Sequence, residues 1–221
     1  AGSGVGREHA LLLASEGAKI IVNDLGDSAD DTTAQIISEG GEALSVKANV
    51  AEWSTGDTLV DAAVSTFGDL HILINNAGIL RDAMSFSMNE AQFDEVIAVH
   101  LKGHFVCARA AGEYWRAQAK SGDETQRRII HTSSESGLFG GPAQANYASA
   151  KGGILTLSIT LGRELTKYGV TTNVVAPRAR TALTDYIQSM AAPENPDEFD
   201  VYDPANVSPF VVWLCTDEAQ G

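Results

Sequence analysis

The sequence predicts an α/β fold, in which helices cover both faces of a doubly wound parallel sheet. Short β-branched or apolar runs alternate with helical patterns of about 10 to 20 residues, as repeated βαβ units require. Each short run is nearly continuous in apolar character, which is expected of parallel strands that are covered on both faces. A glycine-rich turn at residues 1–6 opens the chain ahead of the first helical pattern. We therefore expect a single domain over residues 1–221.

The elements follow in order along the chain. The apolar runs predict strands at residues 19–23, 43–47, 71–75, 128–132 and 171–176. The helical spacing predicts helices at residues 7–16, 29–39, 53–67, 92–119, 146–168 and 206–219. A polar loop is expected at residues 121–126, and the proline- and acid-rich residues 181–205 are expected to form a flexible substrate loop. Because such a fold places a strand before the glycine turn and another after the last helix, we expect further sequence at both ends.

Charge and composition narrow the function classes. Fifteen Lys and Arg against 29 Asp and Glu give a formal net charge of −14, which argues against sequence-independent nucleic-acid binding and against an anionic membrane surface. The two cysteines, Cys107 and Cys215, form no metal-binding pattern, and no metal site is expected. The apolar runs are far shorter than the ~20 residues that a membrane helix needs. We expect a cytoplasmic location, or a peroxisomal one in a eukaryote.

The glycine turn predicts a phosphate site. Glycines at the start of a helix let the backbone approach a pyrophosphate at the positive helix N-terminus. Asp24 ends the next predicted strand, where its carboxylate can accept hydrogen bonds from both ribose hydroxyls of an adenosine and would repel a 2′-phosphate. The turn alone can be a packing device and Asp24 alone a capping acid, but together they favour a site for NAD. The turn residues expected to contact this cofactor are Gly2, Ser3, Gly4, Val5 and Gly6.

A second group of polar residues surrounds the ends of the third and fourth predicted strands. Tyr147 and Lys151 stand four residues apart, so one helix face presents both, and an ammonium beside a phenol favours the phenolate. Tyr147 can then act as acid and base, while Ser134 donates a hydrogen bond to the carbonyl or alkoxide oxygen. A Tyr–Lys pair at this spacing is usually an ordinary surface pair, and a serine after a strand is usually a turn residue. Their joint spacing with the glycine turn and Asn75 favours catalysis.

Together these motifs resemble the short-chain dehydrogenase/reductase family over essentially the whole chain. The resemblance rests on the turn at residues 1–6, the Asn-Asn-Ala-Gly tetrad at residues 75–78, Ser134, and the Tyr-Ala-Ser-Ala-Lys signature at residues 147–151. It implies a Rossmann-like fold and hydride transfer between a secondary alcohol and NAD. Beyond the turn and Asp24, the cofactor contacts that it implies are Asn49, Val50, Asn76, Ala77, Gly78, Tyr147, Lys151 and Pro177.

Within the family, the chain is similar to the (3R)-hydroxyacyl-CoA dehydrogenase modules of multifunctional enzyme type 2, also called 17β-hydroxysteroid dehydrogenase type 4, and to their actinobacterial relatives. Residues 22–26, 76–82, 99–103 and 144–147 carry this similarity. It implies a 3-hydroxyacyl-CoA, or a related steroid, as the substrate. The apolar residues of the expected substrate loop offer surface for a bulky acyl chain or ring system. They are Leu183, Tyr186, Ile187, Met190 and Phe199.

Three positions depart from the family pattern. His100 stands where the family usually has an asparagine that helps a water to relay protons from the lysine. An imidazole can also hold a water, but a lone histidine between apolar neighbours is more often a core residue. Asn49 stands where an aspartate is common, and its amide can bond an adenine edge or form a turn. Arg178 stands where the family usually has a glycine after Pro177, and with Arg180 it can bind a substrate phosphate, although solvated loop arginines are the commoner case.

The helix that holds Tyr147 predicts an assembly contact. It carries one apolar stripe (Ile154, Leu157, Leu161, Leu165) and a second one that lies about 120° away (Ala148, Gly152, Leu155, Ile159). A single core contact needs only one stripe. The second stripe favours a helix-to-helix contact between subunits, and the resemblance implies dimers or tetramers. A wide buried face within one chain is the alternative.

The sequence therefore predicts an NAD-dependent oxidoreductase that interconverts a secondary alcohol and a ketone, with a 3-hydroxyacyl-CoA as the expected substrate. Alternatives within the family are a 3-oxoacyl-carrier-protein reductase, which would prefer NADPH, and a hydroxysteroid dehydrogenase. The alternative of another class is a dinucleotide-binding regulator that binds NADH without oxidising an alcohol. The intact Ser134, Tyr147 and Lys151 disfavour the regulator.

Overall fold

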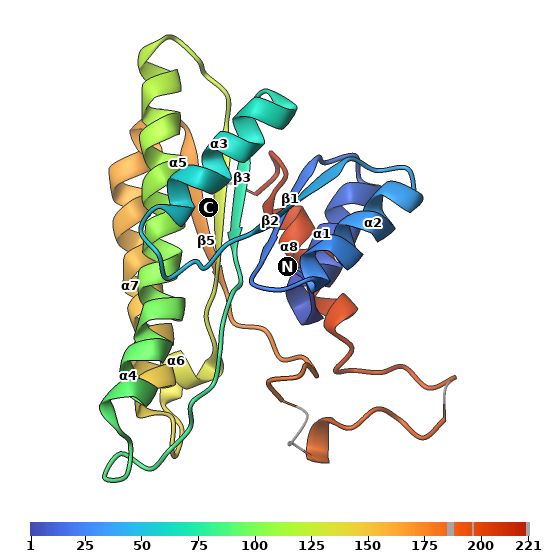
Figure 1. Cartoon of the computed structure of the whole chain (residues 1–221), viewed down its shortest axis with the longest axis vertical. Coiled ribbons are helices and arrows are strands. Elements are labelled where there is room, and N and C mark those ends of the chain that lie inside the picture. Colours follow the sequence, from blue (N-terminus) through green and yellow to red (C-terminus); the bar gives the residue numbers. More distant parts are fainter. Residues whose placement is uncertain (185–187, 196, 220–221) are drawn as a thin grey trace. The chain divides into compact units, whose positions relative to one another are not determined.

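The computed structural model describes residues 1–184, 188–195 and 197–219. The chain divides into two compact units, and each is described by itself. Unit 1 comprises Ala1–Lys47 and Pro177–Trp213, and unit 2 comprises Ala48–Ala176 and Leu214–Gly221. Each unit has its own group of parallel strands (Figure 1). Among the described residues, no helix is long and apolar enough to cross a membrane.

Unit 1 is built on two parallel strands, which pair in register from Ile20 opposite Ala43 to Asp24 opposite Lys47. Small and branched apolar residues of its first two helices pack against the strands in a core of Ala10, Ala14, Val22, Ala29 and Ile36. Its elements are α1 (Gly4–Ser15), β1 (Ile20–Asp24), α2 (Ser28–Ser38), β2 (Ala43–Lys47), the 3-10 turns η3 (Gln188–Met190) and η4 (Pro204–Val207), and α8 (Ser208–Leu214).

Unit 2 contains a parallel sheet in the order β3-β4-β5, with long helices running beside it (Figure 1). Its core joins α5, α7 and the two strands β4 and β5 through residues that include Trp115, Ile129, Leu161 and Val170. The elements are α3 (Thr55–Phe67), β3 (Ile72–Asn75), α4 (Glu90–Ile97), the π-helical turn η1 (Ala98–Lys102), α5 (Gly103–Lys120), β4 (Arg127–Thr132), α6 (Glu135–Phe139), α7 (Ala145–Leu165), η2 (Thr166–Tyr168) and β5 (Val170–Val175).

A buried arginine fixes the start of β4. The Arg127 side chain is 2% exposed, and its guanidinium lies 2.7 Å from a carboxylate oxygen of Asp69 and 2.6 Å from one of Asp123. Burial alone would lower the pKa of Arg127, but these two carboxylates hold it above its usual value. The pair of ionic bonds therefore ties the loop before β3 and the loop before β4 to one charge.

All five predicted strands are found, each within a residue or two of the expected bounds. The predicted helix at 92–119 is wrong in one respect, because it begins at Glu90 and is interrupted by η1. The last helix was expected to continue to residue 219 but ends at Leu214, where Arg128 donates hydrogen bonds to the carbonyl oxygen of Thr216. The short helix α6 was not predicted. Tyr186 and Ile187 of the expected substrate loop lie outside the described residues.

The two apolar stripes of α7 have different surroundings. Ile154, Leu161 and Leu165 are buried in unit 2, as expected of the core stripe. In the second stripe, α6 packs closely against Gly152, where a Cβ would lie 3.1 Å from the carbonyl oxygen of Gly137. Ile159 is 55% exposed. The second stripe therefore serves an internal helix contact at one end and is open at the other.

Candidate active site

The glycine turn of unit 1 presents backbone donors at the start of α1. Ser3 is the N-cap residue in an extended conformation (φ −152°), and its side chain makes no capping hydrogen bond. The first N–H groups of the helix are therefore available to an anion. Gly4 has φ +56°, a left-handed conformation that favours glycine. Gly2 packs so closely on α2 that a Cβ would lie 2.2 Å from the Ser28 hydroxyl oxygen.

Asp24 is held in place beside this turn. Its carboxylate accepts a hydrogen bond from the backbone N–H of Gly2 (2.9 Å) and another from that of Leu25 (2.8 Å). Burial alone would raise the pKa of Asp24, but the hydrogen bond from the Gly2 N–H, the charge of the Ala1 ammonium and the hydrogen bond from the Leu25 N–H bring it below its usual value. The side chain is 33% exposed, so part of the carboxylate at the end of β1 is accessible and can accept further hydrogen bonds.

The expected substrate loop is braced within unit 1 by Arg180. Its guanidinium forms an ion pair with Asp200 and donates to the carbonyl oxygen of Met190 (3.2 Å), and its backbone N–H donates to Tyr202. Arg180 therefore holds the two ends of the loop together, and a carboxylate already neutralises the charge that was expected to meet a substrate phosphate. Arg178 is exposed.

In unit 2, close backbone contact places Ser134 and the Tyr147–Lys151 turn on adjoining helices. Ser134 follows β4 and caps α6, where its hydroxyl accepts the N–H of Ser136 at 3.2 Å, so its own proton remains to be donated. A Cβ at Gly137 would lie 2.6 Å from the backbone of Lys151, so only glycine permits this approach of α6 to α7. The Ser133 hydroxyl donates to the carbonyl oxygen of Lys151 at 2.8 Å, which fixes α7 against the end of β4.

Lys151 is buried, and its ammonium donates a hydrogen bond to the carbonyl oxygen of Thr132 at 2.6 Å. Burial lowers the pKa of Lys151 to about 7. The ammonium lies 5.7 Å from the centroid of the Tyr147 ring. Lys151 can therefore gain or lose a proton near neutral pH and act electrostatically on the Tyr147 phenol.

His100 packs against the other side of Tyr147. The two rings meet edge to face at 5.2 Å, and a Cβ at Gly78 would lie 2.5 Å from Cε1 of His100. Nε2 of His100 lies 3.0 Å from the backbone nitrogen of Ile79 and 2.8 Å from its carbonyl oxygen. Burial, together with the charge of Lys151, lowers the pKa of His100 to about 3. His100 is therefore neutral at physiological pH and positions the 76–79 turn and the Tyr147 ring.

A buried histidine pair was given no role from the sequence. Nδ1 of His131 on β4 lies 3.2 Å from Nδ1 of His104 on α5, and the two rings stack at 5.3 Å. The Asn75 amide nitrogen lies 3.3 Å from the same His131 nitrogen. Burial and the charge of Lys151 lower the pKa of His131 to about 4 and that of His104 well below its usual value. No spacing rule could find this pair, because the two residues are 27 positions apart.

Asn146 is a second residue that the sequence reasoning left without a role. It is fully buried, and its amide nitrogen donates to the carbonyl oxygens of Arg81 (3.0 Å) and Gln92 (2.9 Å). Its side-chain oxygen accepts the N–H of Tyr147 at 2.7 Å. Asn146 therefore fixes the start of α7, and with it Tyr147, to the loop after β3 and to α4. Its place next to Tyr147 was the only signal in the sequence.

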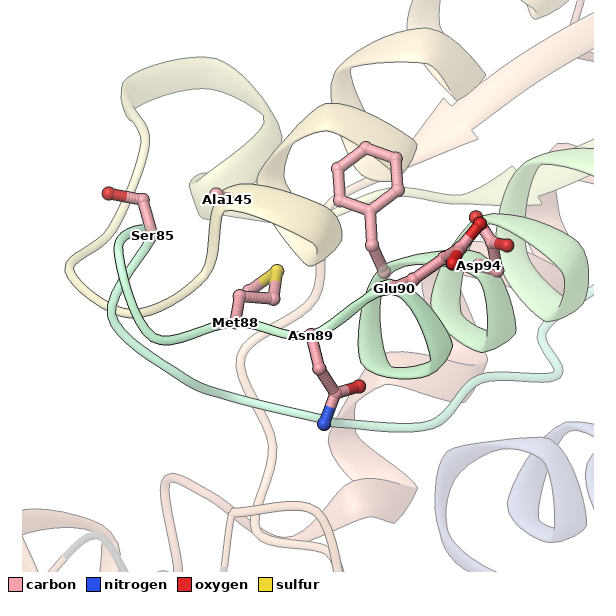
Figure 2. Close-up of a pocket in the computed structure, with 7 residues that line it drawn as sticks. Ser85, Met88, Asn89, Glu90, Asp94 and Ala145 are labelled. Atoms are coloured by element: carbon pink, nitrogen blue, oxygen red, sulfur yellow. The ribbon is translucent and has the colours of Figure 1, made fainter.

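An open pocket of about 370 Å³ adjoins this region of unit 2. Figure 2 shows that the loop before α4, α4 itself and the first residue of α7 contribute its walls. The lining residues are Ser85, Met88, Asn89, Glu90, Phe93, Asp94 and Ala145. Two of them are carboxylates, and none is a predicted catalytic residue, so the pocket does not coincide with the predicted positions Ser134, Tyr147 and Lys151.

The remaining predicted cofactor residues lie at the ends of strands or at close packing points. The Asn49 side-chain oxygen accepts the N–H of Ala51 at 3.0 Å, which is a turn-forming bond, and Val50 packs on Gly103. The Asn76 side-chain oxygen accepts the Thr132 hydroxyl at 3.2 Å. Ala77 is exposed and Pro177 is half-buried. Among the described residues, no group of three or more metal-ligating side chains occurs.

Comparison with known proteins decides the family. Residues 1–194 match the family described as short chain dehydrogenase. The chain belongs to the short-chain dehydrogenase family. A crystal structure of a short chain dehydrogenase from Mycobacterium avium superposes with a TM-score of 0.89 at 46% identity, covering 99% of this chain and 76% of that one. The α/β fold predicted from the sequence is thereby confirmed.

Several curated short-chain dehydrogenases are similar over most of the chain. Hydroxyacyl-CoA dehydrogenase ChsB1 of Mycobacterium tuberculosis is 41% identical over 227 residues, which are 99% of this chain and 71% of ChsB1. Peroxisomal multifunctional enzyme type 2 of Mus musculus is 38% identical over 230 residues, which are 100% of this chain and 29% of that enzyme. A 3-oxoacyl-[acyl-carrier-protein] reductase of Synechocystis is 41% identical over 179 residues, which are 80% of this chain and 70% of that enzyme. This short-chain dehydrogenase is therefore an oxidoreductase that acts on CH–OH groups.

Proposed function

We propose that this short-chain dehydrogenase oxidises a 3-hydroxyacyl-CoA to the 3-oxoacyl-CoA with NAD, or catalyses the reverse reaction. The observation that carries the proposal is the α6–α7 contact, which brings the Ser134 hydroxyl, the Tyr147 phenol and a buried Lys151 to adjoining helices. The substrate class is supported by the names of two relatives, a hydroxyacyl-CoA dehydrogenase and a peroxisomal multifunctional enzyme.

The residues of unit 1 fit the adenosine half of NAD. The uncapped start of α1 offers backbone N–H groups to a pyrophosphate, and the oriented Asp24 carboxylate offers acceptors to ribose hydroxyls. When bound, NAD supplies the acceptor for the hydride that leaves the alcohol carbon. Of the unit 2 residues, the Asn49 amide nitrogen would bond the adenine edge, and Asn76, Ala77 and Gly78 would contact the cofactor through their turn.

The proton chemistry falls to the chain's own side chains. Ser134 donates a hydrogen bond to the substrate oxygen, and Tyr147 as a phenolate takes the hydroxyl proton as the ketone forms. The charge of Lys151 stabilises that phenolate, and its pKa of about 7 lets it pass a proton on near neutrality. In the reducing direction the same phenol returns the proton to the alkoxide oxygen.

Exposed apolar side chains support a substrate with a large apolar part. The loop after β3 and the loop after α6 are joined by a hydrogen bond from the Ala83 N–H to the Ala143 carbonyl oxygen (2.9 Å). Ala143 has φ +63°, which is strained for a residue with a side chain and is typical of functional loops. Large apolar residues are exposed in the loop after β3 (Met84, Phe86) and in the last turn of α6 (Leu138, Phe139). We propose that they cover the acyl chain, while Arg178 meets a CoA phosphate.

Replacement of Tyr147 by phenylalanine tests the assignment. Tyr147→Phe should lower the turnover of 3-hydroxyacyl-CoA thioesters about 10²-fold or more, because only the proton-transfer group is lost. NADH binding, measured by fluorescence titration, should change less than about twofold, because binding energy and proton transfer are separable. Tyr168→Phe is the matched control, since Tyr168 also has a lysine over its ring but lies at the far end of α7. A Tyr147→Phe enzyme that keeps more than half of the activity would falsify the assignment.

A 3-oxoacyl-carrier-protein reductase is the second candidate, because such an enzyme of Synechocystis is 41% identical. The two candidates differ in cofactor and in substrate carrier. Comparison of kcat/KM for NAD and NADP, with CoA and carrier-protein thioesters of the same acyl chain, separates them. Asp24 favours NAD.

We also propose that the enzyme assembles as a homodimer or homotetramer. The open end of the second α7 stripe supports this proposal, since Ile159 exposes an apolar side chain one turn after the half-buried Leu155 of the same stripe. Light scattering of the purified protein measures the state, and a monomer at working concentration would contradict it.

A further inference from the structure

Lys47, the cation opposite Asp24 in the strand register, is already neutralised. Lys47 is the register partner of Asp24, so the two residues end β2 and β1 side by side. The Lys47 ammonium lies 2.7 Å from a carboxylate oxygen of Asp27 and 2.6 Å from one of Asp30. These two carboxylates hold the pKa of Lys47 above its usual value. A lysine that could otherwise reach a phosphate beside Asp24 is thus tied to two acids of α2 and its cap.

The packing of unit 1 places Lys47, Asp27 and Asp30 next to the proposed ribose site. Gly2 donates its N–H to Asp24 and packs directly on Ser28, the first residue of α2. Asp27 immediately precedes Ser28 and is the N-cap residue of α2. The Ser45 hydroxyl donates to the second carboxylate oxygen of Asp30 at 2.5 Å, which fixes that side chain over β2.

We propose that Asp27 and Asp30 are specificity-determining residues, which keep Lys47 from binding the 2′-phosphate of NADP. This inference rests on the proposed binding of NAD by unit 1. Asp24 repels a 2′-phosphate directly, because both are anions. Asp27 and Asp30 add a second, separate exclusion: they cancel the one cation that the strand register sets beside Asp24. Discrimination by removing an attraction as well as adding a repulsion is a general route to specificity.

Substitutions at these positions should leave the fold intact, because the three side chains are at the surface. Asp27 is 93% exposed, Asp30 49% and Lys47 41%. Ion pairs between exposed side chains contribute little to stability. Changes in ligand binding can therefore be measured in folded protein, with the melting temperature as the check.

The experiment compares D27N/D30N with the wild type and with D27N/D30N/K47Q. The probes are 5′-AMP, adenosine 2′,5′-bisphosphate, NADH and NADPH, and the readout is the equilibrium dissociation constant from calorimetry or fluorescence. In D27N/D30N, Lys47 is released and two negative charges are gone, so we expect binding of the two 2′-phosphorylated probes to tighten about tenfold at low salt. Binding of 5′-AMP and NADH should change less than about twofold, because these probes carry no 2′-phosphate. The K47Q substitution in this background should remove most of the gain.

Asp31 offers a matched control in the same turn of α2. D30N and D31N each remove one negative charge from the first turn, but of these two acids only Asp30 forms an ion pair with Lys47 in the described part of the chain. D30N should therefore tighten 2′-phosphate binding more than D31N does. An equal effect of the two variants, or a gain that persists in D27N/D30N/K47Q, would show general charge repulsion and overturn the role of Lys47.

Binding of NADH and 5′-AMP by the wild-type protein distinguishes the masking of Lys47 from the proposed NAD site. A wild-type protein that binds NADH and 5′-AMP, with no gain of 2′-phosphate binding in D27N/D30N, refutes the masking of Lys47 alone. A folded wild-type protein that binds neither NADH nor 5′-AMP refutes the NAD site, and this inference with it.

Discussion

Lowering the pH should destabilise this chain already at pH values well above those at which carboxylates titrate. The reason is that the folded chain buries four imidazoles in the neutral form. Burial lowers the pKa of His9 to about 4, and burial with the charge of Lys151 lowers those of His131 and His100 to about 4 and about 3. His104 shifts in the same direction. Unfolding returns each histidine to a pKa near 6.5.

The sign follows from proton counting. Below pH 6.5 the unfolded chain binds protons that the folded chain excludes, so the free energy of unfolding falls as the pH falls. Between pH 7.5 and 5.5, each histidine whose folded pKa stays below 5 lowers that free energy by about 1.3 kcal/mol. His9 acts on unit 1, and His100 and His131 together remove about 2.6 kcal/mol from unit 2. Lys151, with a pKa of about 7, acts mainly in the range above neutrality.

Urea unfolding at pH 7.5, 6.5 and 5.5 and constant ionic strength measures this loss. Far-ultraviolet circular dichroism follows the whole chain, and the fluorescence of the buried Trp115, measured with Trp53 and Trp213 replaced by phenylalanine, reports on unit 2. His9→Gln should cancel about 1.3 kcal/mol of the pH dependence, since glutamine can still bond the Ser208 hydroxyl but does not titrate. His71→Gln is the control, because His71 is 56% exposed. A free energy of unfolding that changes by less than about 1 kcal/mol over this range would refute the reasoning.

Two further predictions concern single positions. Arg127→Met should lower the free energy of unfolding by about 3 to 5 kcal/mol in urea titrations, because it removes the buried cation that pairs with the partly buried Asp69 and Asp123. The matched change at the exposed Arg163, Arg163→Met, should alter this free energy by less than about 0.5 kcal/mol. Gly78→Ala should displace His100 from the Tyr147 ring, since the added Cβ would lie 2.5 Å from the imidazole, and should therefore lower alcohol oxidation more than tenfold. Overpacking of this site should lower the free energy of unfolding by roughly 1 to 3 kcal/mol, and a melting curve should still show a folded protein. Unchanged turnover in Gly78→Ala would contradict the positioning role of His100.

The sequence was sufficient for features that depend on local spacing. Strand runs and helical periodicity depend on neighbouring residues, so they predicted the parallel strands and most of the helices, whereas the catalytic roles of Ser134, Tyr147 and Lys151 stay predictions. Features that depend on contacts between distant residues were not predictable. Lys151 is buried because Thr132 and Ser133 of another element meet it, and Arg180 is engaged because Asp200 lies opposite. Short α6 escaped notice, since five residues give no periodicity.

The π-helical turn at Ala98–Lys102 sets the rotation of α5 relative to α4 about the helix axis. A π turn holds one residue more than an α turn, and each residue of an α-helix advances the direction of a side chain by about 100°. Deleting one residue there would restore a regular helix from α4 to α5, yet it would rotate one helix against the other by about that angle. His104 would then turn away from His131, and Val106 and Trp115 would leave the core. Because of the extra residue, one continuous helical segment directs His100 toward Tyr147 and the core side chains of α5 toward the sheet.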